Sequence, residues 1–133
     1  MKIQNISEVE QIEMNKPDME GLRIREIIDK EKAGSTRMTF EIGEIPPGKA
    51  HLMHRHPNAE QTMHVHEGSV QCNFEDRTER LDEGDVVFLE MGEWHEVRND
   101  TDETAVLYVA YGGVGSLEDA GYELKDKSIK SHR

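Results

Sequence analysis

Hydrophobic and polar residues alternate with the two-residue period of β-strands along much of the chain from residue 22 onward. The alternation is clearest before the Pro-Pro-Gly sequence at 46–48, where apolar Met38, Phe40 and Ile42 alternate with polar Arg37, Thr39 and Glu41. Because successive side chains of a strand point to opposite faces, this pattern predicts β-strands rather than helices.

Short segments of this kind follow one another at close intervals. By residue number, the expected strands are 22–28, 36–45, 49–56, 61–66, 69–74, 86–90, 95–99 and 104–111. Glycine and proline residues separate many of them, and many short strands with such breaks favour a β-sandwich or a small barrel. The run Ala105–Tyr111 is continuously apolar or aromatic, so we expect it to be buried on both faces.

The two ends of the chain are less regular. In residues 1–20, Ser7 and Glu10 fit a capping box, but apolar residues at every third position fit only part of a helix face. The chain becomes polar after residue 112, and Lys125–Arg133 reads as a solvated basic end. The prediction is one domain over 1–133, with an N-terminal arm at 1–35, a barrel core at about 36–112 and a C-terminal tail at 113–133.

Composition narrows the function classes. The chain has 133 residues, of which 35% are hydrophobic and 33% charged, as expected of a globular protein. Its 16 Lys and Arg against 28 Asp and Glu leave a net charge of -12, which argues against nucleic acid as a partner. No segment resembles a secretion signal or a membrane span, and Cys72 is the single cysteine, so we expect a cytoplasmic protein without an intramolecular disulfide.

Three histidines are the candidate metal ligands. His54 and His56 stand two apart on an extended segment, so both rings point to the same side of a sheet. His95 lies on a separate expected strand, and Gln61 follows a turn at Pro57 and Asn58. Imidazole nitrogens are common ligands of divalent transition metals, and three of them beside an amide oxygen would leave positions free for substrate. The pattern therefore predicts a metal site.

The spacing of these residues resembles the two motifs of the cupin superfamily. The first is matched by Gly48, His54, His56, Gln61 and Gly68, with Gln where the family usually has Glu. The second is matched by Gly84, Gly92, His95 and Asn99, with Glu90 in place of the usual proline. The resemblance implies an all-β, double-stranded β-helix (a jelly-roll cupin barrel), one divalent metal inside it (Fe, Mn, Ni or Zn), and often a homodimer that exchanges N-terminal strands.

Glu60 is the alternative to Gln61 as the fourth ligand, but a slip of one residue reverses the face of a strand, which favours Gln61. By the same parity, we expect His51, His64 and His66 to face away from the metal. A metal-free cupin is the alternative to the whole site. For other residues we expect structural roles. Cys72 and its strand neighbours should pack in the core, Met63 should line the pocket wall, and Glu90 should lie in a turn.

Function is the least determined property, because one fold hosts many chemistries. Gln61 and three neutral histidines would leave the full charge of the metal in place, which favours small anionic ligands such as hydroxy- or keto-acids. We therefore expect an enzyme that uses the metal as a Lewis acid on a sugar acid or keto-acid, in an isomerase or lyase reaction. The spacing is similar to that of cupins that linearise unsaturated uronates, although their substrate-binding arginine is absent from 112–124.

Two other functions stay open at this point. Without Gln61, the three histidines resemble the iron site of cupin dioxygenases. A ligand-binding or sensing module without turnover is the third alternative. No catalytic residue is identified, because few candidate proton-transfer groups appear on the metal face.

Overall fold

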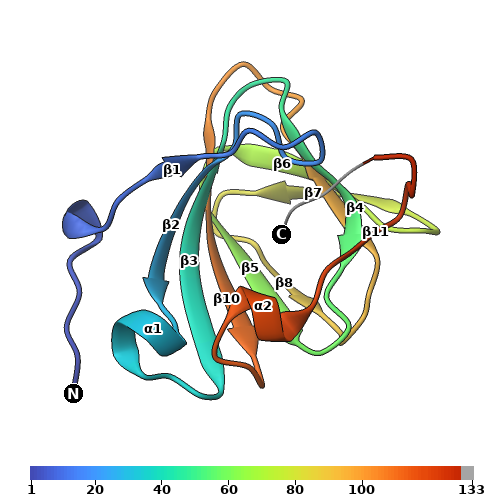
Figure 1. The fold of residues 1–133 in the computed structure, drawn as a ribbon. Coiled ribbons are helices and arrows are strands. Elements are labelled where there is room, and N and C mark those ends of the chain that lie inside the picture. The colour runs from blue at the N-terminus through green and yellow to red at the C-terminus, as the bar shows by residue number, and fades with distance from the viewer. Residues whose placement is uncertain (130–133) are drawn as a thin grey trace.

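Two antiparallel β-sheets face each other in the computed structural model, which describes residues 1–129 (Figure 1). The first sheet has the order β1 (Ile12–Glu13), β2 (Arg23–Ile28), β3 (Met38–Ile45), β10 (Ala105–Gly112), β5 (Glu60–Glu67) and β8 (Val86–Leu89). The second has the order β11 (Glu123–Leu124), β4 (Ala50–Arg55), β9 (His95–Arg98), β6 (Ser69–Asn73) and β7 (Thr78–Asp82). This architecture confirms the predicted all-β jelly-roll barrel.

All eight predicted strand segments are strands, with bounds that differ by no more than two residues. The two-residue strands β1 and β11 and the longer strand β7 were not predicted, and the sequence of β7, Thr-Glu-Arg-Leu-Asp, carries a single apolar residue, Leu81. Strand β7 lies at the edge of the second sheet, where it pairs only with β6 and needs no apolar alternation. Helices are short: a 3-10 helix at Ile6–Glu8, α1 (Lys30–Ala33) and α2 (Leu117–Ala120).

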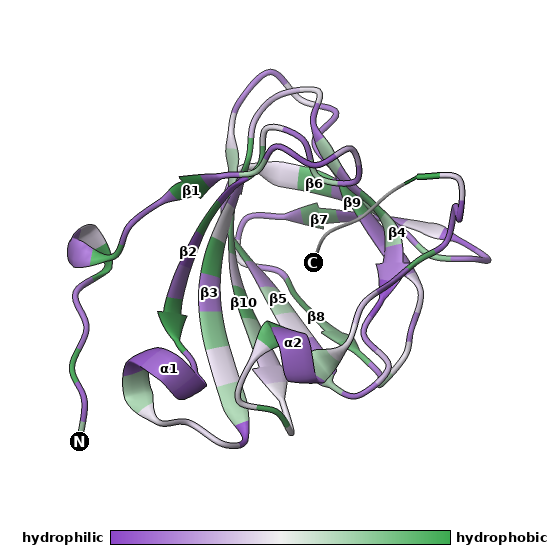
Figure 2. Cartoon of the chain, in the orientation of Figure 1, coloured by the Kyte–Doolittle hydropathy of each residue, from purple (hydrophilic) through white to green (hydrophobic). Residues whose placement is uncertain are grey.

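The alternation of β3 is present, and Figure 2 shows its hydrophobic and hydrophilic bands, but the polar set faces the barrel interior. Thr39 and Glu41 are buried between the sheets. Ile42, on the outer face, is buried in a second apolar cluster with Val9 and Ile27 from the N-terminal segment. The arm therefore covers part of the outer face of the first sheet.

Strand β10 departs from the prediction of burial on both faces. Its residues alternate between fully buried and half-buried, and only the inner set, which includes Leu107 and Tyr111, belongs to the main core. The outer set includes Val106 and Tyr108, which pack against the second cluster and stay partly exposed. The prediction is thus wrong for the outer face of this strand, because the N-terminal arm covers that face incompletely.

Two motif positions have structural roles. Gly68 joins β5 to β6 at a φ of +83°, and a Cβ atom there would lie 3.1 Å from the Thr104 carbonyl oxygen and from Ala105 Cα. Asn99 is fully buried, and its side-chain amide donates to the carbonyl oxygens of Ile45 and Glu103, both at 2.7 Å. These residues fix the turns that bring the strands of the two sheets into register.

The N-terminal capping box is not formed. The 3-10 helix at Ile6–Glu8 is capped instead by the Asn5 side chain, which accepts a hydrogen bond from the Ser7 N–H at 2.9 Å. Further along, β2 joins β3 within the same chain, so the arm is partly built into the first sheet. In the described part of the chain, no helix has the length and apolar character needed to cross a membrane.

The predicted C-terminal tail contributes to the barrel. After α2, strand β11 pairs with β4 and places Leu124 opposite His54, and Ala120 and Leu124 are buried. Lys125 extends over the surface, where its Nζ lies 2.6 Å from Glu75. The last part of the predicted basic end, residues 130–133, lies outside the described residues.

Candidate metal centre

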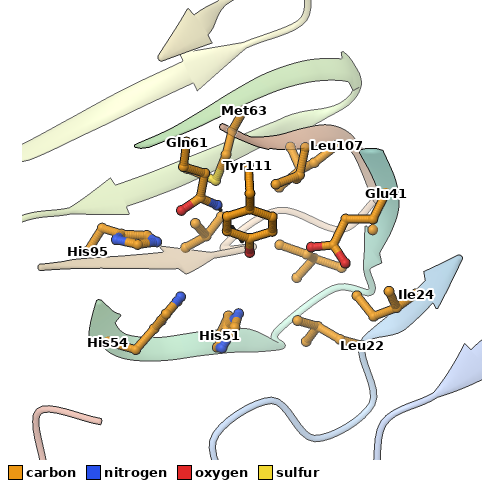
Figure 3. Close-up of a pocket in the computed structure, with 14 residues that line it drawn as sticks. Leu22, Ile24, Glu41, His51, His54, Gln61, Met63, His95, Leu107 and Tyr111 are labelled. Atoms are coloured by element: carbon orange, nitrogen blue, oxygen red, sulfur yellow. Dashed lines mark hydrogen bonds between the residues drawn. The ribbon is translucent and has the colours of Figure 1, made fainter. Parts of the chain in front are cut away.

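Strand pairing brings the three motif histidines together. His54 on β4 and His95 on β9 are direct cross-strand partners, and His56 follows β4 by one residue. All three side chains are buried, and one ring nitrogen of each lies within 4.8 Å of the others. Figure 3 shows His54 and His95 pointing into the same space from adjacent strands. These three residues could hold a metal ion.

The hydrogen bonds of the three rings set their tautomer. Nδ1 of His54 lies 2.7 Å from the Leu52 carbonyl oxygen, and Nδ1 of His95 lies 2.9 Å from that of Glu93. Nδ1 of His56 is 2.9 Å from the Gly121 carbonyl oxygen, which the C-terminal segment supplies. Because a carbonyl oxygen only accepts, each Nδ1 carries a proton and donates it, so in a neutral ring the lone pair is on Nε2.

Burial favours the neutral form of His54 and His95. It lowers the pKa of His54 well below its usual value, and the neighbouring rings of His51, His95 and His56 lower it further. Burial also lowers the pKa of His95, against the opposing effect of the Glu93 carbonyl. Neutral imidazoles with Nδ1 bonded to a carbonyl are the form in which histidine binds metals.

Gln61 lies inside the barrel and Glu60 outside it. Gln61 is 5% exposed on β5, whereas the adjacent Glu60 is exposed. Among residues 1–129, neither Gln61 Oε1 nor His95 Nε2 has a hydrogen-bond partner, although both atoms are buried. Buried polar atoms are rarely left unsatisfied, and a divalent metal would satisfy both. The donor set thus fits such an ion.

The prediction that His51 faces away is wrong. Its ring stacks on that of His54 with centroids 3.7 Å apart and an angle of 15° between the planes. The pairing of β4 with β9 is irregular between His51 and His54, and this bulge shifts the side-chain phase on which the parity argument depends. His51 thereby lines the cavity (Figure 3).

His51 is held by residues from both ends of the chain. Its Nε2 lies 2.9 Å from the Tyr122 hydroxyl, which in turn donates to the fully buried Asp18. Since the hydroxyl proton is directed to Asp18, the hydroxyl accepts from the Nε2–H of His51. Sequence reasoning missed Asp18 and Tyr122, which lie 33 residues before and 71 residues after His51 in the sequence.

The remaining sequence predictions have mixed outcomes. His64 and His66 lie on the outer face, as parity predicted, where both rings contact Tyr108. Cys72 is buried in the main core, and this burial raises the pKa of its thiol to about 12. Met63 lines the cavity, as predicted, and Glu90 is an exposed residue at the end of β8.

Two spaces lie beside the histidines. The inner cavity has room for only about 40 Å³, the space of a few water molecules, and is lined mainly by apolar side chains together with Glu41 and Tyr111. At the barrel mouth, beside His56 and Tyr122, lies a wider pocket of about 540 Å³. Residues of the N-terminal segment and of α2 form its walls, so both ends of the chain shape the approach to the site.

Solved structures with a similar fold include the polyketide cyclase RemF from Streptomyces resistomycificus, at 25% identity and a TM-score of 0.75, covering 84% of this chain and 79% of that one. A predicted oxalate decarboxylase from Thermotoga maritima has 20% identity, a TM-score of 0.73, and coverage of 85% and 100%. A protein with a double-stranded β-helix domain from Klebsiella pneumoniae has 18% identity, a TM-score of 0.72, and coverage of 96% and 99%.

None of the curated proteins matches this chain significantly. Residues 41–111 match the family model described as Cupin domain, and this segment contains His54, His56, Gln61 and His95. As the match spans more than half of the sequence, and the fold and the buried histidine cluster agree with it, the protein belongs to the cupin family.

Proposed function

We propose that the protein binds one divalent transition metal (Fe, Mn, Ni or Zn) through His54, His56, His95 and Gln61, and that it is an isomerase or lyase acting on a small sugar acid or keto-acid. The observation that carries the proposal is the hydrogen bonding of the three Nδ1 atoms, which leaves the Nε2 lone pairs for a metal. When bound, the metal would act as a Lewis acid on a carbonyl or carboxylate oxygen.

The charge of the cavity supports a small, singly charged anion as substrate. Three neutral histidines and an amide leave both positive charges of the ion uncompensated by its ligands. The described residues that line the inner cavity include Glu41 but no Lys or Arg, so the metal would be the positive group that holds an anion there. The likeness to RemF, named a polyketide cyclase, supports a catalytic role.

Metal analysis of tag-free protein tests this proposal. Elemental mass spectrometry after loading with each candidate metal should find about one ion per chain, as expected for a single site. His54→Ala and His95→Ala should each lose the ion. The matched control is the double variant His64→Ala/His66→Ala, which removes a second His-X-His pair from the outer face and should keep the metal. Full metal content in His54→Ala would contradict the site.

An oxygen-using iron enzyme is the second candidate. It is favoured by the approach of the three histidine rings, which each place one nitrogen within 4.8 Å of the others and would form a three-histidine iron site without Gln61. Iron as the bound metal, with oxygen uptake in the presence of small thiols or diketones, would support this candidate. Metal and ligand binding without turnover of either class would support a binding or sensing role.

The same proposal includes a homodimer in the cytoplasm that does not bind nucleic acid. The net charge of -12 supports the last point, because a nucleic-acid groove needs a positive surface.

A further inference from the structure

A buried carboxylate faces the metal centre from another strand. Glu41 lies on β3 and is 5% exposed, and it lines the same inner cavity as His54, Gln61 and His95. Figure 3 shows its carboxylate directed into the cavity from the side opposite to His95. Its neighbours in the lining include Ile24 and Leu107, so most of the wall around it is apolar. Removing a carboxylate from water in this way costs free energy, and such sites are enriched in functional groups.

We infer that Glu41 is the catalytic base of this site, acting on a small carbonyl compound that carries a C–H bond next to its carbonyl group. The inference rests on the proposed function. The Glu41 carboxylate takes the proton of that C–H bond and becomes a carboxylic acid. The electron pair of the broken bond forms a C=C bond, and the pair of the C=O bond moves to oxygen. When Glu41 returns a proton to the same carbon and the electron pair on oxygen re-forms the C=O bond, the hydrogen of that C–H bond has been exchanged without any oxidant or reductant.

Other polar groups near the histidines contact the proposed ligands or one another. The Tyr111 hydroxyl lies 3.5 Å from Gln61 Nε2 and 3.3 Å from His56 Nε2, so it bridges two proposed ligands. His51 is tied through Tyr122 to Asp18. Glu41 comes from the first sheet and faces the two histidine strands of the second. A carbonyl compound held at the histidines would therefore present its adjacent carbon toward Glu41.

Charge and size restrict the substrate class further. The two positive charges of the ion and the single negative charge of Glu41 leave a net charge that matches one substrate carboxylate. The inner cavity, about 40 Å³, accepts only the reacting end of a molecule, and the rest would occupy the wider pocket at the mouth. The class is thus a singly charged keto-acid, with a larger substituent directed toward His56 and Tyr122.

Proton exchange tests Glu41 without knowledge of the natural substrate. The probes are pyruvate and 2-oxobutanoate, and proton NMR follows exchange of their C3 protons in D₂O with the metal-loaded protein. Glu41→Gln should slow the exchange by at least about 100-fold, a typical contribution of a general base. The matched control is Glu44→Gln, on the same strand but paired at 2.9 Å with Arg23 on the outer face, and it should exchange at the wild-type rate. Glu41→Asp, which keeps a carboxylate, should be intermediate.

Two further readouts separate a catalytic role from a structural one. Metal content should be unchanged in Glu41→Gln, and the Tm of the metal-free variant should equal or exceed that of the wild type, because an amide is cheaper to bury than a carboxylate. A Tm lower by more than about 5 °C, roughly 1 kcal/mol for a domain of this size, would assign Glu41 to stability instead. Equal exchange rates in wild type and Glu41→Gln, or no exchange by wild type with either probe, would overturn the inference. Failure of the wild type to bind metal would overturn the proposed function instead.

Discussion

Gln61 and Tyr111 are direct partners across β5 and β10, and the amide Nε2 of Gln61 lies 3.5 Å from the Tyr111 hydroxyl oxygen. An amide that directs its nitrogen to Tyr111 has its oxygen on the other side, and Oε1 is buried without a partner in residues 1–129. The hydroxyl of Tyr111 is also 3.3 Å from His56 Nε2. Tyr111 therefore orients Gln61, whereas a bound metal would replace it at His56, because Nε2 of a neutral imidazole has one lone pair.

Gln61→Glu should keep the metal bound but weaken the capture of anions, because the net charge of the site falls by one. We expect the Kd of pyruvate for the metal-loaded protein, measured by calorimetry, to rise about tenfold, which corresponds to about 1.4 kcal/mol. Glu60→Gln changes the charge of the exposed neighbour and is the control. An unchanged Kd in Gln61→Glu would refute the charge argument.

Tyr111→Phe should weaken metal binding without unfolding the barrel, because it removes only the hydroxyl that orients the Gln61 amide. Loss of a group that orients ligands typically lowers metal affinity by about 10- to 100-fold. Competition with a chromophoric chelator measures the effect. Tyr108→Phe, on the outer face of the same strand, should leave the affinity unchanged. Equal affinities in the two variants would show that Tyr111 has no positioning role.

Acid should destabilise the metal-free protein. Burial lowers the pKa of His54 and His95 in the folded protein. In the unfolded chain both have the ordinary histidine pKa of 6.5, so below that pH they bind protons that they do not bind in the folded protein. The unfolded state then binds more protons, and the free energy of unfolding rises with pH up to about that value and levels off above it. Each histidine contributes up to about 1.4 kcal/mol per pH unit.

Urea denaturation between about pH 5.5 and 7.5 measures this dependence. The double variant His54→Ala/His95→Ala should show a smaller slope than the wild type, whereas His64→Ala/His66→Ala should not differ from it. Identical slopes in the wild type and the His54/His95 variant would show that these two histidines do not cause the pH dependence of stability.

Gly68→Ala should destabilise the fold more than Gly84→Ala. Both glycines have a positive φ, +83° and +93°, so an alanine at either position costs about 1 kcal/mol or more in backbone strain. At Gly68 the added Cβ also meets backbone atoms at 3.1 Å, whereas at Gly84 it meets nothing within 4 Å. Denaturation of both variants isolates the contribution of the close contact. A Gly68 variant no less stable than the Gly84 variant would exclude that contribution.

We expect a dimer in which the N-terminal arm contacts a second copy of the chain. The arm extends away from the barrel (Figure 1), and its Ile3 and Ile6 are exposed, as are Val86 and Phe88 at the opposite edge of the first sheet. Light scattering after size exclusion should give twice the monomer mass, and removal of residues 1–7 should shift it toward the monomer. A monomeric wild type would exclude this arrangement.

By itself, the amino-acid sequence determined the strands and the histidine cluster. Alternation and the glycine and proline breaks between strands are local properties, so eight strands could be located without knowledge of their partners. The spacing of His54, His56 and His95 between motif glycines also predicted that they converge, and strand pairing brings them together. The exposed edge strand β7 lacks an apolar pattern and was missed for that reason.

Only the tertiary structure decided which other groups share the cavity. A period of two shows that side chains alternate but not which face is interior, and the N-terminal segment, by covering the outer face of β3, leaves Glu41 inside. A bulge in β4 directs His51 toward His54, although their odd separation in the sequence predicted opposite faces. Tyr122 arrives from a segment whose polar sequence indicated a solvated tail. Each of these placements depends on contacts between residues distant in the chain, which no local pattern encodes.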